Sequence, residues 1–291
     1  MYNSKDYFKY IANKDNVKLK DYLKDNGISS RFYREVTRES VILVNDKVTK
    51  NNILLKKGDE ILVKIPEEKL NAEAEEGPIH ILYEDDDLLV VNKEPYMVTH
   101  TAKSNINNTL LNYACYYFKK QDIKRKVRFV NRLDRDTSGI VIIAKNSHAH
   151  STISAQFEDD TVIKKYIALT KNNFKTNKVG IIELPIKRTE EGIKRTISED
   201  GKYSKTGYEV LEENEDIAIV KLRLYTGRTH QIRVHLSHMG CSIIGDELYG
   251  EKSDIINRQA LHCFYIEFDH PRSGNRLKIE APLFDDMKKI L

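Results

Sequence analysis

Three stretches of the sequence carry side chains that can do chemistry, and they lie at residues 130–139, 164–169 and 226–235. In the first, VNRLDRDTSG, arginine and aspartate alternate before a Thr-Ser-Gly turn. An ionised carboxylate in such a loop can act as a nucleophile or a base, but a loop Asp–Arg pair with ordinary turn chemistry explains the same residues. In the second, KKYIAL, Tyr166 stands at the head of an expected strand, where a tyrosine is usually a half-buried core residue.

The third stretch, TGRTHQIRVH, places two guanidinium and two imidazole groups within residues 228–235. If this stretch is a strand, Gln231, Arg233 and His235 share one face. That face could hold phosphates or a buried carboxylate, because guanidinium groups pair with both. An exposed polar hairpin is an equal alternative on composition alone.

The composition limits the class of protein. The chain has 291 residues, of which 40% are hydrophobic and 32% charged, so it can form a real core and is neither collagen-like nor wholly disordered. No apolar run approaches the roughly 18 residues that a membrane span needs, and the first residues do not resemble a signal peptide. Three scattered cysteines predict a reduced, cytoplasmic protein with no disulfide framework and no closed zinc site.

The chain is predicted to divide into a small domain at 1–66, a linker at 67–78 and a large domain at 79–291. The spacing of Leu19, Tyr22 and Leu23 predicts a helix that stops at Asn26-Gly27, and Ser29 and Ser30 are candidate caps for a second helix. Breaks at Asn45-Asp46 and Gly58-Asp59 then indicate strand turns. The linker, EEKLNAEAEEG, is acidic and poor in apolar residues.

Positive charge is concentrated in the small domain. Residues 1–64 hold 14 Lys/Arg and 9 Asp/Glu, a net +5 against +4 for the whole chain. A solvated helix face accounts for this charge, and so does a surface that binds a polyanion. The candidate RNA-binding residues are Lys18, Lys20, Arg31, Arg34 and Arg38.

The large domain alternates strand-like runs with a few helix-like pieces. Strands outnumber helices and are separated by hairpin-like breaks, so the fold class is α+β with a mixed, mainly antiparallel sheet, preceded by the small α+β domain. His148 and His150 lie on an expected helix and are predicted to be surface residues. Neither a phosphate-binding loop nor a GxGxxG motif is present, so no nucleotide cofactor is expected.

Taken together and in order, NRLDRDTSG, KKYIAL and TGRTHQIRVH closely resemble the signature of RluA/RluD-type RNA pseudouridine synthases. Further stretches at residues 82–95, 243–250, 261–271 and 280–284 extend the resemblance over nearly all of the large domain. Residues 17–64 resemble, more loosely, the alpha-L RNA-binding module of a small-subunit ribosomal protein. The resemblance implies an isomerase that converts uridine in structured RNA to pseudouridine without metal or cofactor. Large-subunit ribosomal RNA is the first expected substrate and transfer RNA the next, and a monomer is expected.

The resemblance also implies roles for the site residues. Asp134 would act at the ribose anomeric carbon, either by adding to it or by removing an adjacent sugar proton. Arg233 would pair with that carboxylate and fix its direction. Tyr166 would stack on the detached uracil. Because the uridine must leave its stack, the remaining residues would brace or bind the RNA, and these are Arg132, Leu133, Arg228, His230 and Gln231.

Two departures from the family pattern leave alternatives open. Asn131 stands where the motif commonly has His, and the family's NKPxG loop is here Asn92-Lys93-Glu94-Pro95-Tyr96. A catalytically inactive RNA-binding or assembly factor is one alternative. A glycosidase-like hydrolase is another, since an Asp and a Tyr beside a sugar suit both reactions.

Overall fold

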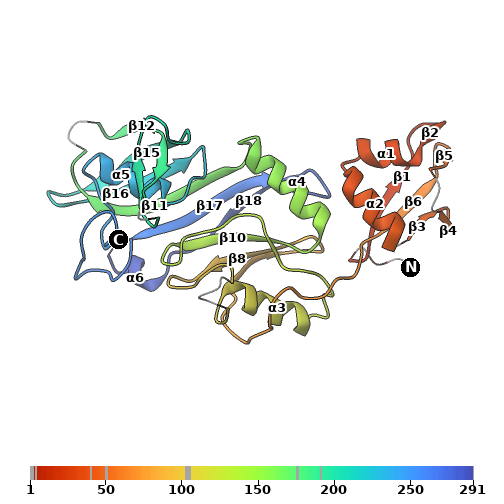
Figure 1. Ribbon diagram of the computed structural model, residues 1–291, viewed down its shortest axis with the longest axis horizontal. Coiled ribbons are helices and arrows are strands. Elements are labelled where there is room, and N and C mark those ends of the chain that lie inside the picture. The colour runs from red at the N-terminus through yellow and green to blue at the C-terminus, as the bar shows by residue number, and fades with distance from the viewer. Residues whose placement is uncertain are drawn as a thin grey trace.

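The computed structural model describes residue 3 and residues 5–39, 41–49, 52–101, 106–174, 177–190 and 192–290. Its buried apolar side chains form two separate cores. The smaller core belongs to an N-terminal unit formed by β1 to β6, and the larger to a large unit formed by β7 to α6. Figure 1 shows the N-terminal unit at one end of an elongated molecule. Among the described residues, no helix is long and apolar enough to cross a membrane.

The N-terminal unit packs two helices on a four-stranded antiparallel sheet of order β1-β6-β3-β4. Leu19, Tyr22 and Leu23 are buried, as the helical spacing predicts, and the Ser29 hydroxyl accepts a hydrogen bond from the amide of Phe32. The elements are β1 (Tyr7–Ile11), β2 (Val17–Lys18), α1 (Leu19–Asp25), α2 (Ser30–Glu39), β3 (Ile42–Val44), β4 (Lys47–Thr49), β5 (Leu54–Leu55) and β6 (Glu60–Lys64).

The large unit is built on one ten-stranded sheet, in which eight strands follow the order β12-β15-β16-β11-β17-β10-β8-β7. β18 pairs with β17, and β9 pairs with β10. The β10–β17 pair is parallel and the other pairs of this sheet are antiparallel, which confirms the predicted mixed α+β class. The strands are β7 (Ile81–Glu84), β8 (Leu88–Lys93), β9 (Arg128–Phe129), β10 (Ser138–Ala144), β11 (Ile163–Lys171), β12 (Val179–Glu183), β13 (Ile186–Arg188), β14 (Arg195–Ile197), β15 (Lys205–Glu213), β16 (Ile217–Leu224), β17 (Leu261–Asp269) and β18 (Arg276–Glu280).

The helices of the large unit are α3 (Leu110–Lys120), α4 (Ser147–Glu158), α5 (Gln231–His238) and α6 (Asp285–Lys288). α5 overturns the strand interpretation of TGRTHQIRVH. The Gln231 side chain accepts hydrogen bonds from the Arg228 amide and the Thr226 hydroxyl, and it donates to Lys205 O and Thr206 Oγ1. These bonds close the turn before the helix. Because residues 231–236 are all buried, the helix shows no polar face from which its period could be read.

The two units are joined by contacts of the large unit with β1. Arg272 donates to both carboxylate oxygens of Asp87 at 2.6 and 2.8 Å and to the carbonyl of Tyr7 at 3.0 Å. His148, on α4, packs against the rings of Phe8 and Phe32 at centroid distances of 5.0 and 6.0 Å. His148 is therefore buried, and its predicted surface position is wrong. The helix pattern could not show this, because the covering residues come from the other unit.

Residues 67–78, between the two units, form neither helix nor strand. Leu70, Ala72 and Ala74 pack against the large core, and Glu68 accepts a hydrogen bond from Arg128 at 2.5 Å. The acidic side chains of this segment are thus partly matched by cations of the large unit.

Gly139 lets the loop before β10 approach β17. Its φ is +119°, and a Cβ there would lie 2.3 Å from the carbonyl oxygen of Cys263 and 2.6 Å from its nitrogen. Only glycine combines this backbone conformation with so close an approach. The start of β10, which directly follows the loop that carries Asp134, is consequently held against β17.

We expect Gly139→Ala to cost about 3 kcal/mol or more of folding free energy, which corresponds to a melting temperature lower by about 6 °C or more. The physical reason is the clash of the new methyl group with the Cys263 backbone. The measurement is thermal unfolding followed by circular dichroism. Gly227→Ala is the matched control, because a Cβ at Gly227 meets nothing within 4 Å, and equal melting temperatures of the two variants would contradict the prediction.

Candidate active site

The three sequence stretches meet at one cleft of the large unit, with a volume of about 1240 Å³. The loop before β10 forms one wall, and the turn into α5 forms another. β11 contributes Lys164 and Tyr166 to the lining. The sheet therefore brings together side chains that are up to 99 residues apart in the sequence.

Asp134 forms an ion pair with buried Arg233, and Arg233 in turn forms an ion pair with buried Asp246. Arg233 donates from Nη1 to Asp134 Oδ2 at 3.1 Å. Its Nε and Nη2 donate to the two oxygens of Asp246 at 2.7 and 2.8 Å. Burial alone would lower the pKa of Arg233, but the Asp246 carboxylate, together with Asp134, raises it above the ordinary value. Arg233 is therefore a permanent cation, and its bidentate pair with Asp246 fixes which way it points.

Asp134 differs from Asp246 in exposure. The Asp246 side chain is 1% exposed, whereas that of Asp134 is 29% exposed. The Asp246 carboxylate thus lies in the protein interior. The Asp134 carboxylate faces the cleft, where its Oδ1 accepts no side-chain or backbone hydrogen bond from a residue that the structure describes.

Tyr166 lies on β11 with its side chain buried at the cleft. Burial, with the neighbouring Cys263 thiol and Asp134, raises the pKa of Tyr166 well above its usual value. The phenol is therefore neutral at physiological pH. Its ring can pack on a planar base, and its hydroxyl is not a ready proton acceptor.

His230 adds a third polar group beside Asp134. Its Nε2 lies 3.9 Å from Asp134 Oδ2, and its Nδ1 lies 2.8 Å from the hydroxyl of Tyr249. That hydroxyl accepts the amide N–H of Arg195 at 2.8 Å. Burial lowers the pKa of His230, so the ring is neutral at pH 7. A neutral imidazole can exchange hydrogen bonds with a substrate hydroxyl without competing for Asp134 as a cation would.

Lys93 anchors the loop that carries Asp134 by a hydrogen bond to a carbonyl of that loop. Its ammonium donates to the carbonyls of Glu94, Met97 and Arg135 at 2.8–2.9 Å. Burial lowers the pKa of Lys93 to about 7. Sequence reasoning matched Lys93 and Asp246 to family motifs but gave them no role. Their partners are backbone carbonyls and a residue of another element, which only the fold brings together.

Both departures from the family pattern have local explanations. The Asn131 side chain donates to Ile140 O at 3.0 Å and accepts from the Ile142 amide at 2.8 Å, so it ties the loop to β10. Tyr96 stands where the family loop has Gly and adopts φ +64°, the left-handed conformation that glycine favours. A left-handed backbone conformation is therefore present at this position although the residue is a tyrosine.

The predicted RNA-contacting residues of the cleft divide into two groups. Arg132 and Arg228 are exposed on its rim, where they can meet a phosphate backbone. Leu133 is buried in the large core. Gln231 uses all four hydrogen-bonding positions of its amide inside the protein, so it shapes the turn before α5 and has none left for RNA.

The five basic residues predicted to bind RNA on the N-terminal unit are all exposed. Three of them follow one another at helical spacing on α2, which places them on one face. The residues are Lys18, Lys20, Arg31, Arg34 and Arg38.

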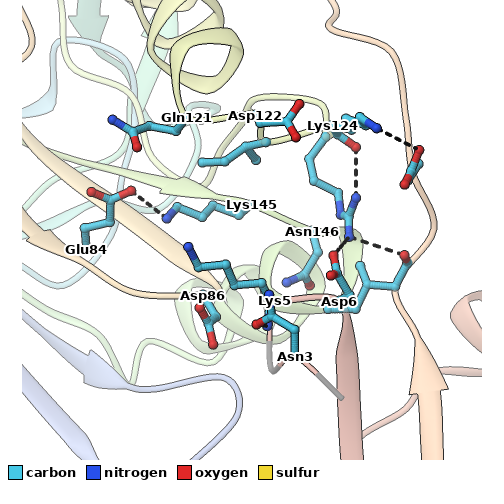
Figure 2. Close-up of a pocket in the computed structure, with 14 residues that line it drawn as sticks. Asn3, Lys5, Asp6, Glu84, Asp86, Gln121, Asp122, Lys124, Lys145 and Asn146 are labelled. Atoms are coloured by element: carbon cyan, nitrogen blue, oxygen red, sulfur yellow. Dashed lines mark hydrogen bonds and ion pairs between the residues drawn. The ribbon is translucent and has the colours of Figure 1, made fainter. Parts of the chain in front are cut away.

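A second cavity, of about 420 Å³, lies between the two units. Figure 2 shows ion pairs in its lining, among them Lys145 with Glu84 at 2.7 Å and Arg125 with Asp6 at 3.6 Å, and Arg125 also donates to backbone carbonyls. None of the three sequence stretches contributes to this lining.

One described group has the atom types of a metal site, namely Asp85, Asp87 and His270, with ligand atoms within 4.8 Å of one another. Both Asp87 oxygens accept from Arg272, and His270 bonds to Asp85 Oδ2 at 2.7 Å. These contacts occupy the ligand atoms with ion pairs inside the large unit.

Comparison with known proteins agrees with this geometry. The sequence pattern of the family described as RNA pseudouridylate synthase matches residues 87–238. The chain is 36% identical over 277 residues to an uncharacterized RNA pseudouridine synthase, YjbO, of Bacillus subtilis, covering 94% of this chain and 98% of that protein. It is 33% identical to the ribosomal large subunit pseudouridine synthase D of Vibrio cholerae, covering 88% and 84% of the two chains.

A solved structure, that of human RNA pseudouridylate synthase domain containing 1, superposes with a TM-score of 0.60 at 30% identity. The match covers 72% of this chain and 86% of the human chain. Asp134, Tyr166 and Arg233 lie within the residues that match the family pattern. The chain belongs to the RNA pseudouridylate synthase family and is an RNA pseudouridine synthase.

Proposed function

We propose that this enzyme converts specific uridines of structured large-subunit ribosomal RNA to pseudouridine, with Asp134 acting at the anomeric carbon of the flipped-out nucleotide. The observation that carries the proposal is the Arg233 hydrogen bond to Asp134, which aims a carboxylate into the cleft from a buried support. The named Vibrio relative supports ribosomal RNA as the substrate class.

The reaction requires the bond from uracil N1 to ribose C1′ to break and a bond from C5 to C1′ to form, while C5 loses its proton and N1 gains one. Asp134 either bonds to C1′ or removes the proton from C2′, as the N1–C1′ electron pair moves onto the uracil. The neutral ring of Tyr166 holds the detached uracil by stacking while it turns. No oxidation or group transfer between molecules takes place, so the chemistry is complete with side chains alone.

RNA binding is divided between the two units. A uridine reaches the cleft only after leaving its stack, and Arg132 on the rim is placed to occupy the vacated space. Exposed cations of the N-terminal unit would bind phosphates outside the cleft, which gives affinity that falls with salt. The docking of His148 and Arg272 against β1 keeps this surface at a fixed distance from Asp134.

The substrate is tested by mapping pseudouridine on total RNA from cells with and without the gene. We expect one or a few sites in large-subunit ribosomal RNA to lose the modification when the gene is absent, and to regain it when the gene is restored. Loss of sites in transfer RNA alone would replace the proposed substrate. No lost site anywhere would favour an RNA-binding assembly factor.

We expect Asp134→Asn to lower the single-turnover rate by about 10³-fold or more, because the amide cannot act as nucleophile or base at the sugar. The measurement uses a transcript spanning the mapped site, digested to nucleosides and separated by chromatography. RNA affinity and the melting temperature should stay near those of the unchanged enzyme. Wild-type turnover by this variant would overturn the assignment of Asp134, and release of free uracil by the wild-type enzyme would indicate a hydrolase.

Asp246→Asn tests the support of Arg233. We expect kcat to fall about 10²-fold with KM little changed, because a misdirected Arg233 misaims Asp134 without touching the RNA. Unfolding should become easier by about 3 kcal/mol, since a buried ion pair loses one charge. Glu247→Gln, at the exposed neighbouring position, is the control and should keep kcat within about twofold. An unchanged kcat in Asp246→Asn would show that Arg233 needs no such support.

A further inference from the structure

Lys164 is a buried lysine whose ammonium makes no hydrogen bond and no ion pair with any residue that the structure describes, and the Asp160 carboxylate acts on it only from beyond ion-pair distance. It is 7% exposed. The ring of Phe157 lies 5.1 Å from Nζ, a distance that gives a cation–π attraction but replaces none of the three lost hydrogen bonds to water.

The other buried lysines and arginines of the described chain are all satisfied. Lys93 bonds to three carbonyls, Lys145 to Glu84 and a carbonyl, and Arg125 to two carbonyls. Arg233 and Arg258 each hold a carboxylate by two hydrogen bonds. Leaving a buried charge without a partner costs free energy, so the exception at Lys164 indicates a partner that arrives from outside.

The position of Lys164 identifies where that partner enters. Lys164 and Tyr166 alternate with Lys165 along β11 and both line the Asp134 cleft. Lys165 points to the other face, where its Nζ lies 4.6 Å from the ring centre of Tyr265. The ammonium of Lys164 is therefore directed to the same space as the ring of Tyr166.

The flipped base explains the position of the Lys164 ammonium better than a phosphate does. Phosphates follow the outer surface of RNA, and exposed cations such as Arg132 and Arg228 are available to them on the rim. A buried ammonium next to the stacking tyrosine meets the edge of the flipped base instead. Uracil presents its O2 and O4 at that edge.

We propose that Lys164 is a catalytic residue that stabilises the departing uracil as an anion. When the N1–C1′ bond breaks, its electron pair stays on the uracil and spreads over N1, O2 and O4, while C1′ bonds to Asp134 or C2′ gives its proton to Asp134. The negative charge appears only as the bond breaks, so a fixed cation in a poorly solvated site lowers the barrier more than it strengthens binding. The cation is released from this role when C5 bonds to C1′, as the Asp134–C1′ bond breaks or Asp134 returns the proton to C2′. C5 then loses its proton and N1 takes one up, which restores a neutral uracil ring.

This inference rests on the function proposed above, and its test uses the uridine mapped there in a synthetic RNA. Lys164→Met removes the charge but keeps the length and apolar stem, and Lys165→Met removes the neighbouring charge on the opposite face. We expect Lys164→Met to slow single turnover about 10²-fold, with RNA affinity within about threefold, and Lys165→Met to leave the rate nearly unchanged. Lys164→Arg should recover part of the rate, and Lys164→Gln serves as the neutral variant if the Met variant fails to fold.

The decisive experiment repeats the single-turnover measurement on the same RNA with 5-fluorouridine at the target position. Fluorine makes the uracil anion less basic, so its departure needs the cation less. We expect the neutral Lys164 variant to be only about 10-fold slower than wild type on this RNA, measured as loss of the target nucleoside from nuclease digests. Equal slowing on both RNAs would overturn the proposal in favour of a structural role. A loss confined to affinity would overturn it in favour of a phosphate contact. A wild-type enzyme that modifies neither RNA would instead count against the proposed function.

Discussion

The active-site carboxylate is directed by a chain of two ion pairs, from buried Asp246 through Arg233 to Asp134. A guanidinium has a rigid fork of donors, so once two of them are fixed on Asp246 the direction of the third follows. That direction is useful only if the loop that bears Asp134 is equally fixed. Lys93 holds this loop from below, Asn131 ties it to β10, and Gly139 closes it against β17. The ten-stranded sheet thus fixes the positions of the loop that carries Asp134 and of the turn that leads into α5 with Arg233.

Sequence patterns predicted the elements whose structure depends on residues close together in the sequence. The helix at 19–25, the turn at Asn45-Asp46 and the mainly antiparallel sheet follow from apolar spacing and turn residues, and the structure confirms them. The motif resemblance named Asp134, Tyr166 and Arg233, and the structure brings these three to one cleft. What could not be predicted depends on partners distant in sequence. The α5 residues alternate in polarity like a strand, and the helix buries residues 231–236 on all its sides, so the sequence pattern did not indicate it.

The two departures from the family pattern change the side chain and preserve the backbone. An asparagine offers one donor and one acceptor to a strand, and Asn131 uses both on β10. Tyr96 takes up the left-handed φ of the missing glycine, and its side chain is exposed at the cleft. Asn131 is thus one of the residues that fix the loop of Asp134, and the asparagine provides that support itself. The sequence could not show this, because a substitution within a motif does not reveal whether the motif needed the side chain or the backbone conformation.

The cations of the molecule fall into two classes with different physical roles. Exposed cations on α2 and on the rim of the cleft act through water, so their attraction for phosphates is screened by salt and contributes to affinity. Buried Arg233 and Lys164 are little screened, and in the proposed mechanism each faces a group whose charge matters to the reaction, namely the carboxylate at the sugar and the leaving uracil. Raising the salt concentration should therefore weaken RNA binding far more than it slows the chemical step, since screening reaches the first class and not the second. A separation of this kind lets the protein bind many phosphates reversibly without altering the electrostatics at the bond that breaks.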